Sequence, residues 1–220
     1  MTLGLPDEPR WVEAHGIAAD AAGWRRPLGN GFALGHDAAR LIVISDEADT
    51  SAVVALVQAS PAYAVLVPSE ALAAAVETAG RAVQRALLHT LPPDALPDLE
   101  GAMPLPDDAS LAHVPAPLAE ELAYARARGV VWTTYVDDEP VAFAYAPWRS
   151  PRWFDVSVDV LPAARQLGLG AITASAMIRH ERAAGREPVW GADEANVASL
   201  RLAKRLGFVR VDEIWIGAPA

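Results

Sequence analysis

Apolar residues in the first part of the chain fall into short blocks with two alternating periodicities. Compact runs of Val, Leu, Ile and Ala between turn residues predict three strands, at 41–45, 62–68 and 82–91. Apolar positions three and four residues apart predict two helices, at 49–60 and 69–80. The first helix should open at Asp49 or Thr50, and the second should end at Gly80. This βαβαβ order is typical of a small layered α/β domain.

Two stretches of the chain show no sustained periodicity. The glycine-rich residues 29–35 precede a strand instead of following one, and we expect them to form a loop. Residues 92–110 are rich in proline and acidic side chains, which is typical of a connection between two units. We therefore predict a boundary near residue 105, with an N-terminal α/β domain at 1–105 and a second domain at 106–220.

The second domain begins with a different pattern, that of a helix followed by an antiparallel meander. It predicts a short strand, a helix that ends at Gly129, and two strands joined by a tight turn, at 111–115, 117–129, 130–136 and 141–147. The domain is thus expected to be of mixed α/β (α+β) class with a mostly antiparallel sheet.

The next strand, predicted at 153–161, alternates strictly between apolar and polar residues. One face carries Phe154, Val156, Val158 and Val160, and the other carries Asp155, Ser157 and Asp159. On an edge strand the polar face would simply be hydrated. On a central strand it would cost several kcal/mol unless it borders a cleft. Both interpretations stay open at this point.

Composition narrows the classes of function. The chain has 220 residues, of which 52% are hydrophobic, enough for a buried core, and no cysteine, which excludes disulfides, thiolate metal sites and a cysteine nucleophile. It contains no apolar run long enough to span a membrane and no signal-peptide pattern, so we expect a cytoplasmic protein. The net charge of −10 disfavours nucleic acid and anionic lipid as partners. It favours cationic molecules or simply solubility.

Two glycines, Gly168 and Gly170, stand at the start of a helix predicted to end before Gly185. Glycine in a first turn weakens a helix by about 1 kcal/mol, and its presence there lets an anion approach the unpaired amides. A dinucleotide fingerprint is excluded by Thr173 at its third glycine position and by the six residues between strand and glycine. No G-K-[ST] follows, which excludes a P-loop. Close packing of the helix is the alternative explanation for the glycines.

The motif Arg165-x-x-Gly168-x-Gly170 resembles the R/Q-x-x-G-x-G/A signature of the GNAT superfamily of N-acyltransferases. Downstream, Asn196 and Ser199 are followed by the pair 207–208, Gly-Phe, which is similar to the second signature of that family. The resemblance covers about residues 108–217 and extends to a bacterial subset with an extra N-terminal α/β region. It implies a GNAT-like fold in which the mixed sheet is splayed at the cofactor site.

The resemblance also implies where acetyl-CoA, the cosubstrate, would bind. It would lie between the strand at 153–161 and the one at 188–192, with its pantetheine paired to backbone groups of Val158, Asp159 and Val160. Its pyrophosphate would be held by amides of Gln166, Leu167, Gly168, Leu169, Gly170 and Ala171. Arg165 would contact a phosphate or lie on the surface. Asn196 and Ser199 would line the thioester end, or would only cap the helix.

The implied reaction is transfer of an acetyl group to an amine of a small molecule or peptide by direct attack. Asp155, Asp159 and Glu194 are candidates for the base or for binding a cationic acceptor; no metal is expected. Many family members place a tyrosine seven residues after the motif asparagine to protonate the thiolate, and this position is Ala203. Another donor such as Tyr135 or Tyr145, or water, would then serve.

Impaired catalysis is the other outcome, and the alternative function is a non-catalytic acyl-CoA-binding sensor. Residues 1–105 do not repeat the glycine signature, so any GNAT-like ancestry there would be degenerate and without a cofactor site. Two roles stay open for them: a wall of the acceptor pocket or the surface of a homodimer.

Overall fold

A computed structural model describes residues 4–95 and 97–220, which form two compact units. The first unit runs to His89 and also contains Gly191–Val197 and Arg210–Ala220; the second contains Thr90–Trp190 and Ala198–Val209. Two strands, β11 (Glu187–Asp193) and β12 (Val209–Gly217), therefore contribute residues to both units. The assignment of 1–105 and 106–220 to domains with separate roles stays a prediction.

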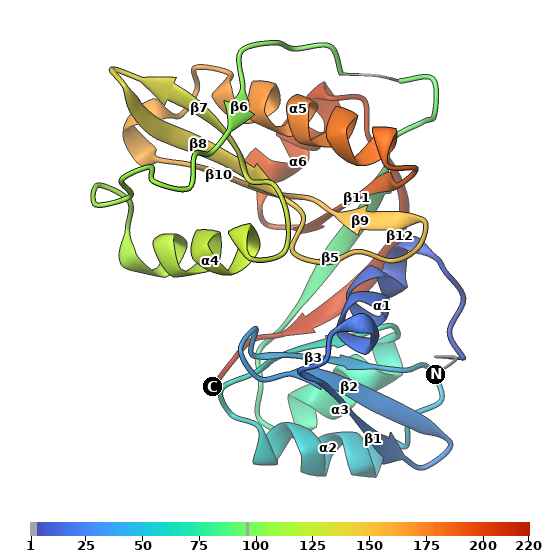
Figure 1. The fold of residues 1–220 in the computed structure, drawn as a ribbon. Helices are drawn as coiled ribbons and strands as arrows, with labels where there is room; N and C mark the ends of the chain where they lie inside the picture. The colour runs from blue at the N-terminus through green and yellow to red at the C-terminus, as the bar shows by residue number, and fades with distance from the viewer. Residues whose placement is uncertain (1–3, 96) are drawn as a thin grey trace. The chain divides into compact units, whose positions relative to one another are not determined.

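The first unit is a sheet with helices packed against it (Figure 1). Its helical elements are η1 (Pro9–Trp11), α1 (Val12–Ala19), α2 (Thr50–Ala59) and α3 (Glu70–Thr78). Its strands before the second unit are β1 (Gly23–Leu28), β2 (Gly31–His36), β3 (Leu41–Ile44), β4 (Ala64–Val67) and β5 (Val83–Thr90). They lie in the order β1-β2-β3-β4-β12-β5, so the last strand of the chain lies between β4 and β5. β3 and β4 are parallel, and β12 is antiparallel to β4.

The βαβαβ order predicted for 41–91 is confirmed. The side chain of Asp49 accepts a hydrogen bond from the amide of Ala52 at 3.0 Å and caps α2. Gly80 has φ +88°, the left-handed conformation that ends a helix such as α3.

The prediction of a loop at 29–35 is wrong, because β1 and β2 form a hairpin there. Gly29 has φ +65° and supplies the turn between the strands. Gly35 faces Trp24 across the pair, where a Cβ atom would lie 1.9 Å from the indole ring. Gly29 is thus a turn residue, and Gly35 is a strand residue that makes room for an aromatic side chain.

The second unit is built on an antiparallel sheet with the strand order β10-β8-β7-β6. Its strands are β6 (Met103–Pro104), β7 (Trp132–Val136), β8 (Glu139–Tyr145), β9 (Trp153–Asp155) and β10 (Ser157–Val160). Its helical elements are α4 (Ala116–Arg126), η2 (Pro162–Ala164), α5 (Leu169–Ala183) and most of α6 (Val197–Arg205). α5 packs on β7, β8 and β10, and α4 lies on the opposite face of this sheet (Figure 1).

Two strand predictions in this unit need correction. Residues 111–115 form a turn, in which the amide of Val114 donates to the carbonyl of Leu111 at 3.0 Å. The strand predicted at 153–161 is divided into β9, which is parallel to β11, and β10, which is antiparallel to β8. The helix ending near Gly129 and the antiparallel meander are confirmed. In the described ranges 4–95 and 97–220, no helix is long and apolar enough to cross a membrane.

Candidate functional site

Acetyl-CoA is expected to lie between two strands. These strands pair with each other over a short distance and then diverge. The amide of Val156 donates to the carbonyl of Val189 at 2.9 Å, and beyond this bond the chain pairs with β8 as strand β10. β10 is an edge strand of its sheet, and alternate backbone groups of an edge strand point away from its neighbour. Val158, Asp159 and Val160 lie on this edge, which suits backbone pairing with an extended ligand.

The two glycines of the motif have different structural roles. Gly168 precedes α5 with φ +81°, and a Cβ atom there would come no closer than 3.7 Å to the guanidinium of Arg205. Gly170 is buried, and a Cβ atom there would lie 3.1 Å from a methyl group of Val160 and 3.4 Å from Leu202. Gly168 therefore supplies a left-handed turn, whereas Gly170 supplies close packing of the helix.

The turn before α5 exposes the start of the helix. Gln166 is also left-handed, with φ +66°. The amide of Ala171 donates to the carbonyl of Gly168 at 3.1 Å, so it is engaged within the helix. By the general rule for helix termini, the amides of Leu169 and Gly170 have no acceptor inside the helix. These amides are the ones best suited to a phosphate.

Two arginines flank this turn. Arg165 is exposed, and its Nε donates to the carbonyl of Val160 at 3.2 Å. Arg205 approaches Gly168 from α6. Leu167, between the two left-handed residues, is 61% exposed. The turn is thus open and surrounded by positive charge, as an anion site requires.

The polar face of β10 is linked to β8 by a buried tyrosine. Tyr145 is 1% exposed, and its hydroxyl donates to Asp159 at 3.0 Å. Burial raises the pKa of Asp159, against the opposing effects of this hydrogen bond and of the charge on Arg165. Burial and the Asp159 charge raise the pKa of Tyr145 well above its usual range. Tyr145 therefore stays protonated and holds Asp159.

Asp155, at the end of β9, is the aspartate of the polar residues 155, 157 and 159 whose pKa is shifted most. Burial raises its pKa from 3.8 to about 7, against a hydrogen bond from the amide of Val156. The charge of Glu121 on α4 adds to the rise. A carboxyl group with a pKa near 7 exchanges protons readily at neutral pH, which is what a general base requires.

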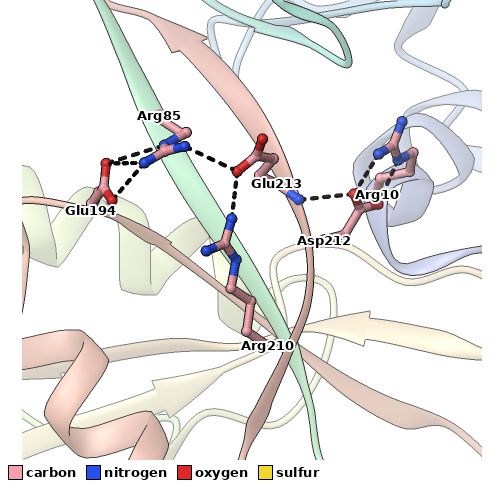
Figure 2. A network of polar contacts seen from close by, with 6 residues as sticks. All are labelled: Arg10, Arg85, Glu194, Arg210, Asp212 and Glu213. Atoms are coloured by element: carbon pink, nitrogen blue, oxygen red, sulfur yellow. Dashed lines mark hydrogen bonds and ion pairs between the residues drawn. The ribbon is translucent and has the colours of Figure 1, made fainter.

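Glu194 lies in a polar network of the first unit (Figure 2). Its carboxylate accepts hydrogen bonds from Arg85 at 2.7 and 2.9 Å, and Arg85 also contacts Glu213 at 3.4 Å. Arg210 pairs with the same Glu213, and Arg10 pairs with Asp212 beside it. The surroundings of Glu194 are those of a structural ion pair.

The second motif forms the start of α6. Asn196 immediately precedes the helix, and Ser199 lies in its first turn. The hydroxyl oxygen of Ser199 accepts a hydrogen bond from the indole N–H of Trp190 at 2.9 Å. The sequence does not show this contact of Trp190, because only the folded chain brings β11 and α6 together.

The position at which many family members carry a tyrosine is occupied here by a buried alanine. Ala203 is 0% exposed, and the amide of Phe208 donates to its carbonyl at 3.0 Å. Of the alternative donors, Tyr135 lies at an irregularity in the pairing of β7 with β8, and Tyr145 is engaged with Asp159.

Comparison with known proteins agrees with this geometry. Residues 121–215 match the model of a family described as GNAT acetyltransferase. None of the curated proteins matches the chain. The resemblance to the GNAT superfamily that was predicted for about residues 108–217 is thus confirmed over residues 121–215.

Solved structures resemble almost the whole chain. A GNAT-family protein from Novosphingobium aromaticivorans is 19% identical, with a TM-score of 0.66 over 96% of both chains. A GCN5-related N-acetyltransferase from Kribbella flavida is 17% identical, with a TM-score of 0.65 over 96% of this chain and 94% of its own. A GCN5-related N-acetyltransferase-like protein from Streptococcus suis is 15% identical, with a TM-score of 0.67 over 98% and 95%. These likenesses confirm the predicted GNAT-like fold.

Proposed function

Because residues 121–215 are a GNAT acetyltransferase region, we propose that this protein is an acetyl-CoA-dependent N-acetyltransferase. Its acceptor would be an amine of a small molecule or peptide. The observation that carries the proposal is the parting of β9/β10 from β11 directly before the open turn at Gly168. An edge strand and an exposed helix start together suit a ligand that has both an extended amide-bearing arm and a pyrophosphate.

The chain's own residues supply the remaining chemistry. Asp155 takes a proton from the attacking amine, because its pKa of about 7 leaves much of it ionised at neutral pH. Tyr145 holds the neighbouring Asp159 in place. The carboxylates of this face also favour a cationic acceptor over an anionic one.

The test begins with binding. Acetyl-CoA, CoA and NADH are titrated separately while thermal unfolding is followed; a ligand at 100 times its Kd adds about 2.7 kcal/mol to the free energy of unfolding. We expect stabilisation by acetyl-CoA and CoA but not by NADH. Absence of a shift with acetyl-CoA overturns the proposal.

Turnover is then followed as release of free thiol across a panel of amines. The chain has no cysteine, so a thiol reagent detects only CoA. The second candidate function, a non-catalytic acyl-CoA sensor, is favoured by Ala203, which is buried where a proton donor is expected. Binding without thiol release from any amine of a broad panel would select the sensor.

A further inference from the structure

The first unit contains a groove of its own, separate from the site described above. One face of α3 lines it together with side chains of β5 and β12, and all of its lining residues belong to the first unit. Its volume is about 410 Å³, which is within the range of pockets that bind small molecules.

The α3 side of the groove combines small and acidic side chains. Glu70, Ala73, Ala74 and Glu77 line it, and their spacing of three, one and three residues places them on one face of the helix. The alanines leave the middle of this face without a long side chain. The two glutamates lie two turns apart, about 10.5 Å along the helix axis. This face of α3 is thus a short apolar surface with an exposed carboxylate at each end.

The sheet side of the groove is apolar and aromatic. Val83 and Trp215 line it, and both are partly buried and pack against the hydrophobic core of the first unit. Gly217 lets β12 approach the same helix closely, because a Cβ atom there would lie 2.6 Å from a methyl group of Val76. An indole attracts organic cations through its π system and contacts alkyl chains through its carbon atoms. The groove therefore suits a cation with an apolar chain.

Arg85 also lines the groove, but its charge is already compensated (Figure 2). Its Nε and Nη2 donate to Glu194 at 3.1 and 2.7 Å, and its Nη1 donates to Glu213 at 3.4 Å. The hydrogen bonds with Glu194 raise the pKa of Arg85, and the charges of Glu213 and Glu70 add to the rise. Each guanidinium nitrogen thus faces a carboxylate, so this arginine is poorly placed to bind an anion.

The surroundings of the groove have an excess of negative charge. Glu213 also pairs with Arg210, so two arginines and two carboxylates balance one another in this network. The carboxylates of Glu70 and Glu77 come in addition to these four groups. A ligand that neutralises them must carry two positive charges.

We propose that this groove binds a linear organic dication, an aliphatic chain with an ammonium group at each end. The chain lies along the alanines of α3 and the indole of Trp215, and the ammonium groups pair with Glu70 and Glu77. This binding site gives the first unit a role of its own. It goes beyond the proposed N-acetyltransferase activity and does not depend on it.

The first test measures binding in the absence of acetyl-CoA. Diaminooctane, whose extended chain is about as long as two helix turns, is titrated while the indole N–H signals of the seven tryptophans are followed by NMR. The signal that is absent in Trp215→Phe identifies Trp215. We expect this signal to shift with diaminooctane until it saturates. Octylamine, with one ammonium group, should bind about two- to fivefold more weakly, and uncharged octanediol should not bind. An unmoved Trp215 signal, or equal binding of octanediol, overturns the proposal.

The second test fills the groove without changing its charge. Ala74→Leu should raise the Kd for diaminooctane at least about fivefold, because the added side chain occupies the space of the alkyl chain. Ala71→Leu is the matched control, since Ala71 is also an exposed residue of α3 but does not line the groove. Equal Kd values in these two variants overturn the proposal.

The third test removes charge without filling the groove. Glu77→Gln should raise the Kd for diaminooctane about two- to fivefold, the effect of losing one exposed ion pair. Glu47→Gln changes the net charge equally and lies in the first unit outside the groove, so it should leave the Kd unchanged. Equal effects of the two variants show attraction by net charge alone and overturn the proposal.

The proposed acceptor site also favours cationic amines, so the two sites must be distinguished. Asp155 belongs to the second unit, and Asp155→Asn should leave the shift of the Trp215 signal unchanged. Loss of this shift in Asp155→Asn overturns the groove. Ala74→Leu should retain acetyl-CoA binding. If the wild type shows the Trp215 shift but does not bind acetyl-CoA, the groove is supported and only the proposed function is overturned.

Discussion

Asp155 is the residue whose ionisation should be visible both in activity and in stability. Its pKa is raised from 3.8 to about 7 in the folded chain. The folded state therefore holds a proton that the unfolded state has lost between these values, so the free energy of unfolding falls as pH rises through this window. Above about pH 7 the carboxylate is ionised, in the form that accepts a proton.

Asp155→Asn should reverse both effects. We expect kcat/KM to fall at least about 100-fold and to lose the limb that rises to about pH 7. The variant should unfold at a higher temperature than the wild type at pH 8, with the difference vanishing near pH 4. Rate profiles and thermal unfolding at both pH values check this. The rate profiles are measured with several acceptors whose amines differ in pKa. If Asp155→Asn keeps the rising limb with all of them, another group is the base.

Gly168 tests the cofactor turn at the level of one residue. Gly168→Glu should abolish acetyl-CoA binding, because it adds a side chain and a negative charge where the phosphates are expected. Gly185→Glu is the matched control: this glycine follows the other end of α5, has φ +82° against +81°, and has open space around its Cβ position. Calorimetric titration should show binding by Gly185→Glu only, and equal affinities would refute the placement of the phosphates.

The sequence predicted residues whose function depends on local spacing but did not show contacts with a distant partner. Gly168 and Asn196 stand out because turns and helix starts require particular residue types at fixed offsets. Trp190 and Tyr145 have no such local signal, since their partners Ser199 and Asp159 lie 9 and 14 residues away along the chain. Their roles become visible only when strands and helices are placed side by side.

The divided strand shows the same limit for a whole element. Strict alternation over 153–161 correctly indicates extended backbone, but it carries no information on which neighbour each half pairs with. β9 and β10 change partner within two residues, from β11 to β8. The hairpin of β1 and β2 was missed for a related reason, because a glycine that accommodates Trp24, such as Gly35, looks like a loop residue in the sequence.

Helix α5 is held at its C-terminal end by a buried carboxylate between two arginines. Glu181 is 2% exposed and contacts Arg149 at 2.6 Å and Arg186 at 2.7 Å. The two arginines lower its pKa against the effect of burial. Arg149 reaches this site from the connection after β8, so the ion pair joins the helix to the sheet it covers.

Glu181→Gln should therefore lower the free energy of unfolding by about 2–3 kcal/mol at pH 7. Because the folded pKa lies below the ordinary value of 4.5, the stabilisation is present above that value and is lost as pH falls through the folded pKa. The difference between wild type and variant should thus shrink in acid. Glu187→Gln, which breaks the more exposed pair with Arg182, should cost less than about 1 kcal/mol. Urea unfolding at pH 7 and pH 3.5 measures the free energy of unfolding of the wild type and both variants. Equal losses of stability in Glu181→Gln and Glu187→Gln at pH 7 would contradict the argument.

Over its whole length, the chain shows the same order of helices and strands twice. The first series is α1-β1-β2-β3-α2-β4-α3-β5, and α4-β7-β8-β9/β10-α5-β11-α6-β12 repeats it with one strand divided. In the first series the turn between β3 and the helix carries Asp46, Glu47 and Asp49 in place of glycines. The side chain of Asp49 also accepts a hydrogen bond from an amide in the first turn of α2. Negative charge at this turn opposes a phosphate.

Each chain should therefore bind one acetyl-CoA. Calorimetric titration of the wild type should give a stoichiometry near one, and Gly168→Glu should give none. Residual binding of one equivalent in that variant would show that the first series retains a site.

The position of β12 also fixes an order of events during synthesis. Residues of this last strand lie between β4 and β5, so the first unit lacks its inner strand while the middle of the chain is being translated. β4 and β5 then expose unpaired backbone edges until residues 210–217 leave the ribosome. A fragment that ends at residue 105 should accordingly aggregate or stay unfolded, and the nascent protein should depend on chaperones until its final strand arrives.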